Sequence, residues 1–149
     1  MSVPVKSILQ TAIRKERSAR AFYLKAARST RDAASKKLLS DLADEEARHA
    51  DILSGEGVKN FLASEPPAIT DLRIEEFLTP KRVSPKASFQ DVLIYAIKRE
   101  AASYRAYQTL AEAAGDASTC RVFRRLANEE RRHRNRLEKL YDDVIFREN

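Results

Sequence analysis

Leu42–His49 reads Leu-Ala-Asp-Glu-Glu-Ala-Arg-His, and the stretch returns 84 positions later as Leu-Ala-Asn-Glu-Glu-Arg-Arg-His over Leu126–His133. Each copy closes on a Glu-x-x-His pair and holds one of the two histidines of the chain. Residues three apart on a helix share a face, so the Glu and His of each pair can reach one point. The repeat therefore predicts two equivalent helices that direct the same pair of side chains inward.

The same offset relates a second pair of segments. Ala12–Glu16 (Ala-Ile-Arg-Lys-Glu) corresponds to Ala96–Glu100 (Ala-Ile-Lys-Arg-Glu), and both glutamates interrupt otherwise apolar helical stripes. Each half of the chain thus supplies one lone Glu and then, about thirty residues later, a Glu-x-x-His pair. This set of side chains is typical of a di-iron or di-manganese carboxylate site inside a four-helix bundle. The candidate metal ligands are Glu16, Glu46, His49, Glu100, Glu130 and His133.

Charge balance favours two metal ions in this predicted site. Four ionised carboxylates inside a bundle would be costly if they were unpaired, and few cations lie on the same stripes. Two divalent cations would balance them, and two neutral imidazoles would complete the ligands. The alternative is a bundle whose Glu and His residues face solvent. That alternative does not account for the recurrence of the Glu and Glu-x-x-His pattern, in register, on the apolar faces. A carboxylate-rich site with two imidazoles suits iron or manganese better than zinc.

Four helical segments follow from the apolar spacing, at about 7–28, 32–53, 88–114 and 116–146. We expect Ser88 and Asp116 to cap the third and fourth helices. Residues 55–87 contain four of the five prolines and little helical period beyond a turn near 71–77. The 149 residues are therefore expected to form one domain, with helical hairpins at about 7–54 and 88–146 joined by a crossover over 55–87.

The long connection fixes the expected topology. Each hairpin has a short turn, so its two helices are antiparallel neighbours. About thirty residues can run the length of a 25-residue helix and start the second hairpin from the other end of the bundle. The sequence predicts an all-α, ferritin-like four-helix bundle with one long crossover between the second and third helices.

Tyr23 and Tyr107 also correspond across the repeat, and each lies seven residues after its lone Glu. Facing inward, their hydroxyls could donate hydrogen bonds to ligand carboxylates or take part in radical chemistry. The alternative is a pair of core tyrosines whose hydroxyls are satisfied locally. Cys120 is the one cysteine, which excludes an internal disulfide and a Cys-x-x-Cys motif. We expect it to be inert.

Composition excludes several other classes. No stretch approaches the roughly twenty apolar residues of a membrane span. The first residues lack the apolar core of a signal peptide, so a cytoplasmic protein without a membrane partner is expected. The net charge is +6, with arginines crowding the last helix. A basic surface can attract nucleic acid, but the basic residues are scattered around the helices. We therefore expect a solvated face and no nucleic-acid partner.

The repeated segments resemble the rubrerythrin branch of the ferritin-like superfamily. The resemblance rests on Ala12-Ile13-x-x-Glu16, on Phe22–Ala27 and on both copies of Leu-Ala-x-Glu-Glu-x-x-His, and it covers nearly all of the chain. It implies a cofactor of two iron ions, with manganese or mixed metals as alternatives. By analogy Glu46 and Glu130 would bridge the metals, and the other four ligands would be terminal. The resemblance also implies reduction of hydrogen peroxide or oxygen.

Two departures from classical rubrerythrins matter. With one cysteine, the chain lacks their four-cysteine rubredoxin domain, so electrons are expected from an external, rubredoxin-like donor. Classical members also carry a second Glu three residues after the third-helix ligand, where this chain has Ser103. This leaves two functions open: a di-iron peroxidase or oxidase, and an iron-binding or storage protein without turnover. A homodimer or larger homo-oligomer is expected in either case.

Overall fold

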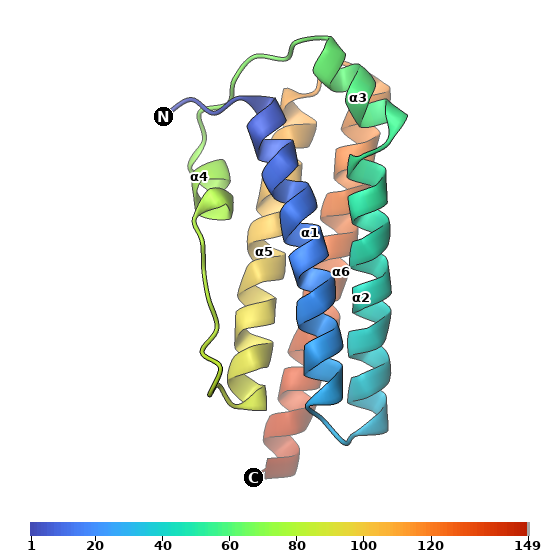
Figure 1. Cartoon of the computed structure of the whole chain (residues 1–149), viewed down its shortest axis with the longest axis vertical. Helices are drawn as coiled ribbons and strands as arrows, with labels where there is room; N and C mark the ends of the chain where they lie inside the picture. The colour runs from blue at the N-terminus through green and yellow to red at the C-terminus, as the bar shows by residue number, and fades with distance from the viewer. Residues whose placement is uncertain (149) are drawn as a thin grey trace.

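Residues 1–148 are described by a computed structural model (Figure 1). This part of the chain contains six helices, and its only β-type pairing is the isolated bridge between Val3 and Ile69. The helices are α1 (Val5–Arg28), α2 (Ala33–Leu53), α3 (Glu56–Ala63), α4 (Leu72–Leu78), α5 (Phe89–Ala113) and α6 (Ala117–Glu148).

The four long helices, α1, α2, α5 and α6, form the bundle. α1 and α2 make one antiparallel hairpin and α5 and α6 the other, and the connection between them returns along the length of the bundle (Figure 1). The predicted all-α four-helix bundle with one long crossover is therefore confirmed. Among the described residues, no helix is both long and apolar enough to cross a membrane.

The crossover holds more helix than the sequence pattern predicted. α4 covers the expected turn near 71–77, but α3 was not expected. α3 is only eight residues long, contains a glycine and buries just Val58 and Phe61, so its period is too short to detect. Farther along, Val3 and Ile69 exchange backbone hydrogen bonds of 2.8 and 2.9 Å. These bonds fasten the crossover to the start of the chain.

Side-chain caps fix the ends of several helices. Ser88 Oγ accepts a hydrogen bond from the backbone N–H of Asp91 at 3.1 Å, and Asp116 accepts one from Thr119 at 2.9 Å, which confirms both predicted caps. Asp32 caps α2 through the backbone N–H of Ser35 at 2.9 Å. These caps set where α2, α5 and α6 begin, and so fix the height of their inward side chains in the bundle.

The apolar core is divided into two parts. One cluster includes Leu9, Phe77 and Phe123, and the other includes Leu39, Leu93 and Leu137. Between them lies a layer of buried polar side chains drawn from all four long helices. A polar layer of this kind is costly unless its groups are paired or bind an ion. The polar layer is therefore the part of the fold that requires a chemical explanation.

Candidate metal centre

The six side chains singled out in the sequence form this polar layer. α1 contributes Glu16, α5 contributes Glu100, and α2 and α6 each contribute a Glu-x-x-His pair. All six are buried, with exposed fractions of 1–3%. The spacing of three residues works as expected, because it brings each Glu and His to the same face of a helix.

His49 lies at the centre of one half of the layer. Its Nδ1 is 2.7 Å from Glu130 Oε1 and 3.5 Å from both Glu16 Oε2 and Glu46 Oε1. One nitrogen or oxygen atom from each of these four residues falls within 4.8 Å of the others. The group has the size and donor types of a single metal site.

His133 occupies the equivalent place in the other half. Its Nδ1 is 2.9 Å from Glu46 Oε1, 3.6 Å from Glu130 Oε1 and 3.7 Å from Glu100 Oε2. These four residues also bring one donor atom each within 4.8 Å of one another. The two groups share Glu46 and Glu130, so the layer offers two adjacent metal positions with two carboxylates common to both.

Unsatisfied buried atoms test whether a metal fits here. Each of the six side chains has at least one buried nitrogen or oxygen atom without a hydrogen-bond partner. Buried polar atoms are normally satisfied, and a group of six such side chains aimed at one region calls for an ion. The donor set of carboxylate oxygens and imidazole nitrogens fits iron or manganese.

The pKa shifts in the metal-free layer also indicate that the layer needs added positive charge. Burial raises the pKa of Glu46 to about 8 and that of Glu130 well above its usual range, with neighbouring carboxylates adding to both shifts. Burial opposes protonation of His133, but the carboxylates around it outweigh burial and raise its pKa to about 12. Burial likewise opposes protonation of His49, whose pKa is raised by its carboxylate neighbours. Protons thus supply positive charge that metal ions would replace.

The two candidate tyrosines contact ligands of the opposite hairpin. The Tyr23 hydroxyl donates a 2.5 Å hydrogen bond to Glu100 Oε1, and the Tyr107 hydroxyl donates a 2.6 Å bond to Glu16 Oε1. Burial and the nearby carboxylates raise the pKa of both phenols well above the usual value. Each tyrosine is therefore a neutral donor that holds one oxygen of a lone Glu and leaves the other free.

Two further carboxylates were missed in the sequence. His49 Nε2 lies 2.8 Å from Glu129 Oε2, and His133 Nε2 lies 3.4 Å from Glu45 Oε2. The contact with His133 lowers the pKa of Glu45 to about 2, so this carboxylate is ionised. Both residues immediately precede the Glu of a Glu-x-x-His pair, and they correspond across the 84-residue offset. The repeated Glu-Glu dipeptide was the signal that could have identified them.

Glu129 orients the His49 imidazole through a hydrogen bond, and Glu45 lies in the equivalent place beside His133. Both rings turn Nδ1 toward the shared carboxylates and Nε2 toward the outer carboxylate, and the rings are stacked with centroids 5.5 Å apart and 9° between their planes. A carboxylate that accepts the Nε2 proton leaves the Nδ1 lone pair available to a metal. Ser103 is also buried, while Cys120 is half-buried and free.

Comparison with solved structures shows the same fold in two other proteins. One is a ferritin-like diiron-carboxylate protein from Thermotoga maritima, 21% identical, with a TM-score of 0.79 over 97% of this chain and 98% of that chain. The other is a bacterioferritin-related protein from Bacteroides fragilis described as a dodecameric thioferritin, 23% identical. Its TM-score is 0.71 over 97% of this chain and 89% of that chain. No curated protein matches the sequence.

The fold is that of ferritin-like proteins, and the carboxylate–histidine layer within it is a candidate dinuclear metal site. The rubrerythrin family model matches residues 7–141, which is nearly the whole chain. The protein belongs to the rubrerythrin family. The family assignment agrees with the resemblance of the repeated motifs, and no rubredoxin domain is evident in the matched region.

Proposed function

We propose that the protein is a non-haem di-iron oxidoreductase that reduces hydrogen peroxide, or oxygen, with electrons from an external redox protein. The observation that carries the proposal is the pair of overlapping four-residue groups that share Glu46 and Glu130. Glu16 and His49 would complete one metal position, and Glu100 and His133 the other. Two iron ions held there would supply the two electrons needed to reduce peroxide to two molecules of water, with uptake of two protons.

The protein's own residues serve this chemistry by holding the ligands. Tyr23 and Tyr107 each fix one oxygen of a lone Glu, and the outer carboxylates Glu45 and Glu129 fix the imidazole rings. The apolar clusters on either side of the layer exclude water from it. Such preorganised surroundings reduce the rearrangement required when the metals change charge.

A second candidate is iron uptake for storage without turnover. The observation that favours it is the similarity to the Bacteroides fragilis thioferritin, which is a dodecamer. Assembly of this chain into a homodimer or larger homo-oligomer is part of both proposals. Ser103 also favours uptake, because serine lacks the additional carboxylate that classical rubrerythrins carry at this position.

Stopped-flow reaction of the diferrous protein with peroxide and with oxygen tests the proposal. A redox enzyme should be reoxidised rapidly and should turn over repeatedly when a reductant is supplied. A storage protein should instead accumulate more than two irons per chain without catalytic consumption of peroxide. Repeated turnover that is lost in Glu46→Ala supports the oxidoreductase, and uptake without turnover overturns it.

A further inference from the structure

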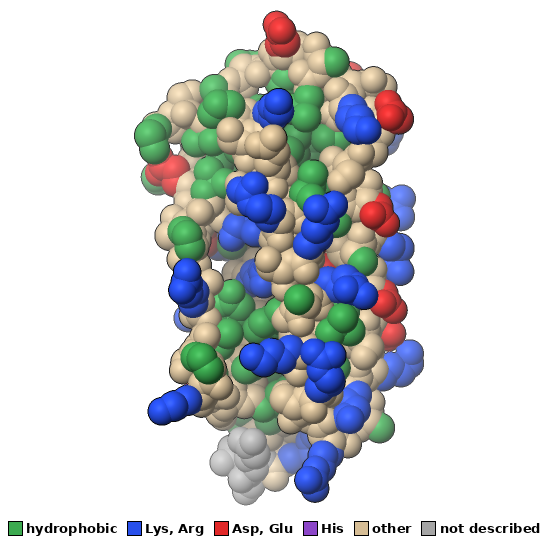
Figure 2. Space-filling view, in the orientation of Figure 1, with side chains coloured by type: hydrophobic (Ala, Val, Ile, Leu, Met, Phe, Trp, Pro, Cys, Tyr) green, Lys and Arg blue, Asp and Glu red, His purple; other side chains and the backbone are tan. Residues whose placement is uncertain are grey.

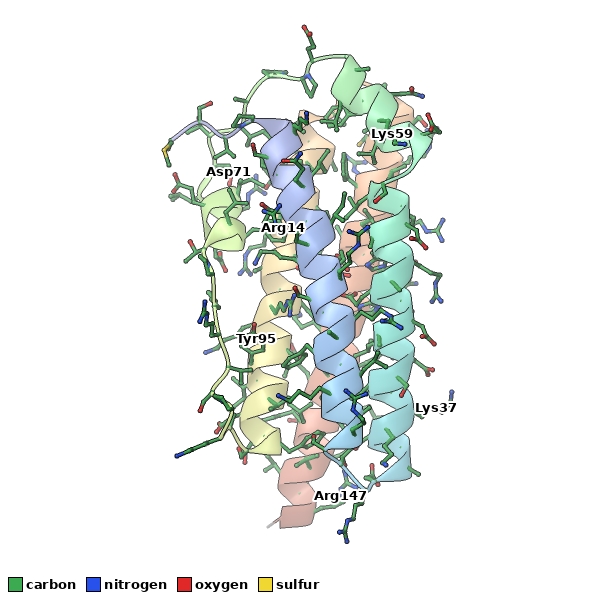
Figure 3. The ribbon with its side chains drawn as sticks, viewed as in Figure 1. Arg14, Lys37, Lys59, Asp71, Tyr95 and Arg147 are labelled. Atoms are coloured by element: carbon green, nitrogen blue, oxygen red, sulfur yellow. The ribbon has the colours of Figure 1, made fainter. Side chains whose placement is uncertain are left out.

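A cleft of about 270 Å³ lies outside the metal centre, between α1, α5 and the crossover. Its walls come from one face of α1, one face of α5, the end of α4 and residues 79–81. Figure 3 labels two of the lining residues, Arg14 on α1 and Tyr95 on α5. Figure 2 shows that Lys and Arg side chains predominate on the face where α1 and the crossover lie.

The basic residues of the cleft belong to the internal repeat. Arg14 and Lys15 directly precede Glu16, and Lys98 and Arg99 directly precede Glu100, at the same 84-residue offset. All four basic residues line the cleft, so it lies where the two halves of the chain face each other. Metal binding explains the two glutamates of this motif but not the basic pair that precedes each of them.

These cations have no acidic partner in the described part of the chain. Among the side chains of residues 1–147, no carboxylate oxygen lies within 4.0 Å of a charged nitrogen of Arg14, Lys15, Lys81, Lys98 or Arg99, all of which line the cleft. The one carboxylate in the lining, Glu76, is already paired with Arg105. Five clustered positive charges therefore face a cleft that contains no free anion of the protein.

Two of the cations are partly withdrawn from water. Lys15 and Arg99 are half-buried, and an Arg99 guanidinium nitrogen donates a 2.5 Å hydrogen bond to the backbone carbonyl of Lys15. Crowded, half-buried cations of like charge are unfavourable unless an anion accompanies them.

The rest of the lining is apolar. Phe77, Pro80 and Ala102 line the cleft beside the cations, and Lys15 Nζ lies 5.0 Å from the centre of the Phe77 ring. The volume of about 270 Å³ lies just below the usual range of small-molecule sites, so the cleft suits a small ligand. The cleft thus has a strongly positive part and an apolar wall. An inorganic anion bound to the cations would make no contact with the apolar wall.

We propose that this cleft binds a small organic molecule that carries a phosphoryl group. Arg14, Lys98 and Arg99 would surround the phosphoryl oxygens, with Lys15 and Lys81 beside them, and Phe77 would contact the organic part. A phosphoryl dianion matches several clustered cations better than a single carboxylate, and guanidinium groups bind its oxygens in pairs. The inference is independent of the proposed redox function, because the cleft does not include any of the six metal ligands.

Calorimetric titration of the metal-loaded protein with phenyl phosphate, inorganic phosphate and phenol tests the proposal. Phenyl phosphate should bind one molecule per chain and more tightly than inorganic phosphate, and phenol should not bind. The double variant Arg14→Gln/Lys98→Gln should weaken phenyl phosphate binding by about tenfold, the combined effect of two partly exposed charges. Both substituted side chains are exposed, so the bundle should fold normally.

The matched control is Lys37→Gln/Lys59→Gln, which removes the same net charge at exposed sites on α2 and α3 (Figure 3). This variant should bind phenyl phosphate as the unmodified protein does. Because phosphate also coordinates iron, the titration is repeated after chelation, and the binding should persist. The proposal is overturned by an absence of saturable binding, by equal affinity for inorganic phosphate, by equal losses in both double variants, or by binding that vanishes with the metal.

Discussion

His49 Nε2 lies 2.8 Å from Glu129 Oε2, although the two residues belong to different helical hairpins. The reverse contact joins His133 of the second hairpin to Glu45 of the first at 3.4 Å. Each half of the repeat thus orients the imidazole of the other half. The two candidate metal positions are therefore coupled through the packing of the hairpins, and neither hairpin alone contains a complete site.

The first prediction concerns this outer carboxylate. Glu129→Ala removes the acceptor that fixes the His49 ring and should weaken metal binding by about 10–100-fold, the usual cost of losing such a partner. Glu129→Gln keeps an acceptor oxygen and should lose less. Competition with a coloured chelator under anaerobic conditions measures the affinity. Asp44→Asn, an exposed neighbour of Glu45, is the control and should bind metal normally. Equal affinities for all four proteins would show that Glu129 does not position the imidazole.

The second prediction concerns the tyrosines. Tyr23→Phe leaves Glu100 Oε1 without its donor in a buried site, and Tyr107→Phe does the same to Glu16 Oε1. Each change should lower the free energy of unfolding of the metal-free protein by about 1–3 kcal/mol. Urea denaturation measures the loss.

The control for the tyrosine variants is Tyr141→Phe, whose half-buried hydroxyl accepts a 3.1 Å hydrogen bond from Gln90. This change should cost less, because the Gln90 amide can turn to water. If all three variants lose a similar free energy of unfolding, the hydrogen bonds of Tyr23 and Tyr107 to the lone glutamates contribute no more than an ordinary half-buried hydrogen bond.

The helices and the metal-ligand candidates could be predicted from the sequence, whereas the contacts between the two hairpins could not. The apolar spacing predicted the four long helices, because helical period is a local property, and the 84-residue repeat pointed to Glu46 and Glu130 as ligands. Which side chains meet across the bundle is not local. The contacts of Tyr23 with Glu100 and of His49 with Glu129 join opposite hairpins, and only the packed structure places those residues together.

The crossover lies outside the repeat, and there the prediction was weakest. α3 was missed because eight residues with two buried positions carry little periodic signal. The cationic cleft was not predicted either, since Arg14 and Lys98 read as residues of solvated helix faces. Their juxtaposition depends on how the end of α4 and residues 79–81 close one side of the space between α1 and α5.

The third prediction is a pH dependence of the stabilisation by metal. In the metal-free protein the pKa of Glu46 is raised to about 8 and that of His133 to about 12. A group whose pKa is higher in the folded state stabilises the fold while it is protonated in both states. That stability declines as pH rises from the unfolded pKa to the folded one. The metal-free protein should therefore begin to lose stability near pH 5, as Glu46 titrates, and the loss should continue above pH 8 because of His133.

Metal binding has the opposite pH dependence: bound cations replace the protons, so the affinity for metal rises with pH. The gain in Tm on adding Mn(II) should consequently be larger at pH 8 than at pH 6. Differential scanning calorimetry at both values, with and without metal, measures it. A gain that is constant or larger at pH 6 would contradict the assigned protonation of Glu46 and His133.

The fourth prediction concerns Ser103. Serine supplies no carboxylate to hold an iron in its oxidised position, so the diferrous protein should react with peroxide more slowly than Ser103→Glu. The added negative charge of the variant should favour the diferric state. Single-turnover rates decide the matter, with Ser103→Gln as a control of similar size without the charge. If the native protein equals or exceeds Ser103→Glu, the six-ligand site is a competent catalyst as it stands.

We propose that the polar layer holds two metal ions between Glu46 and Glu130. Anaerobic titration with Fe(II), followed by gel filtration and elemental analysis, counts them directly. We expect two irons per chain in the unmodified protein and loss of the dinuclear site in Glu46→Ala, with unchanged helical content by circular dichroism. One iron or none in the unmodified protein, or two retained in Glu46→Ala, would contradict it.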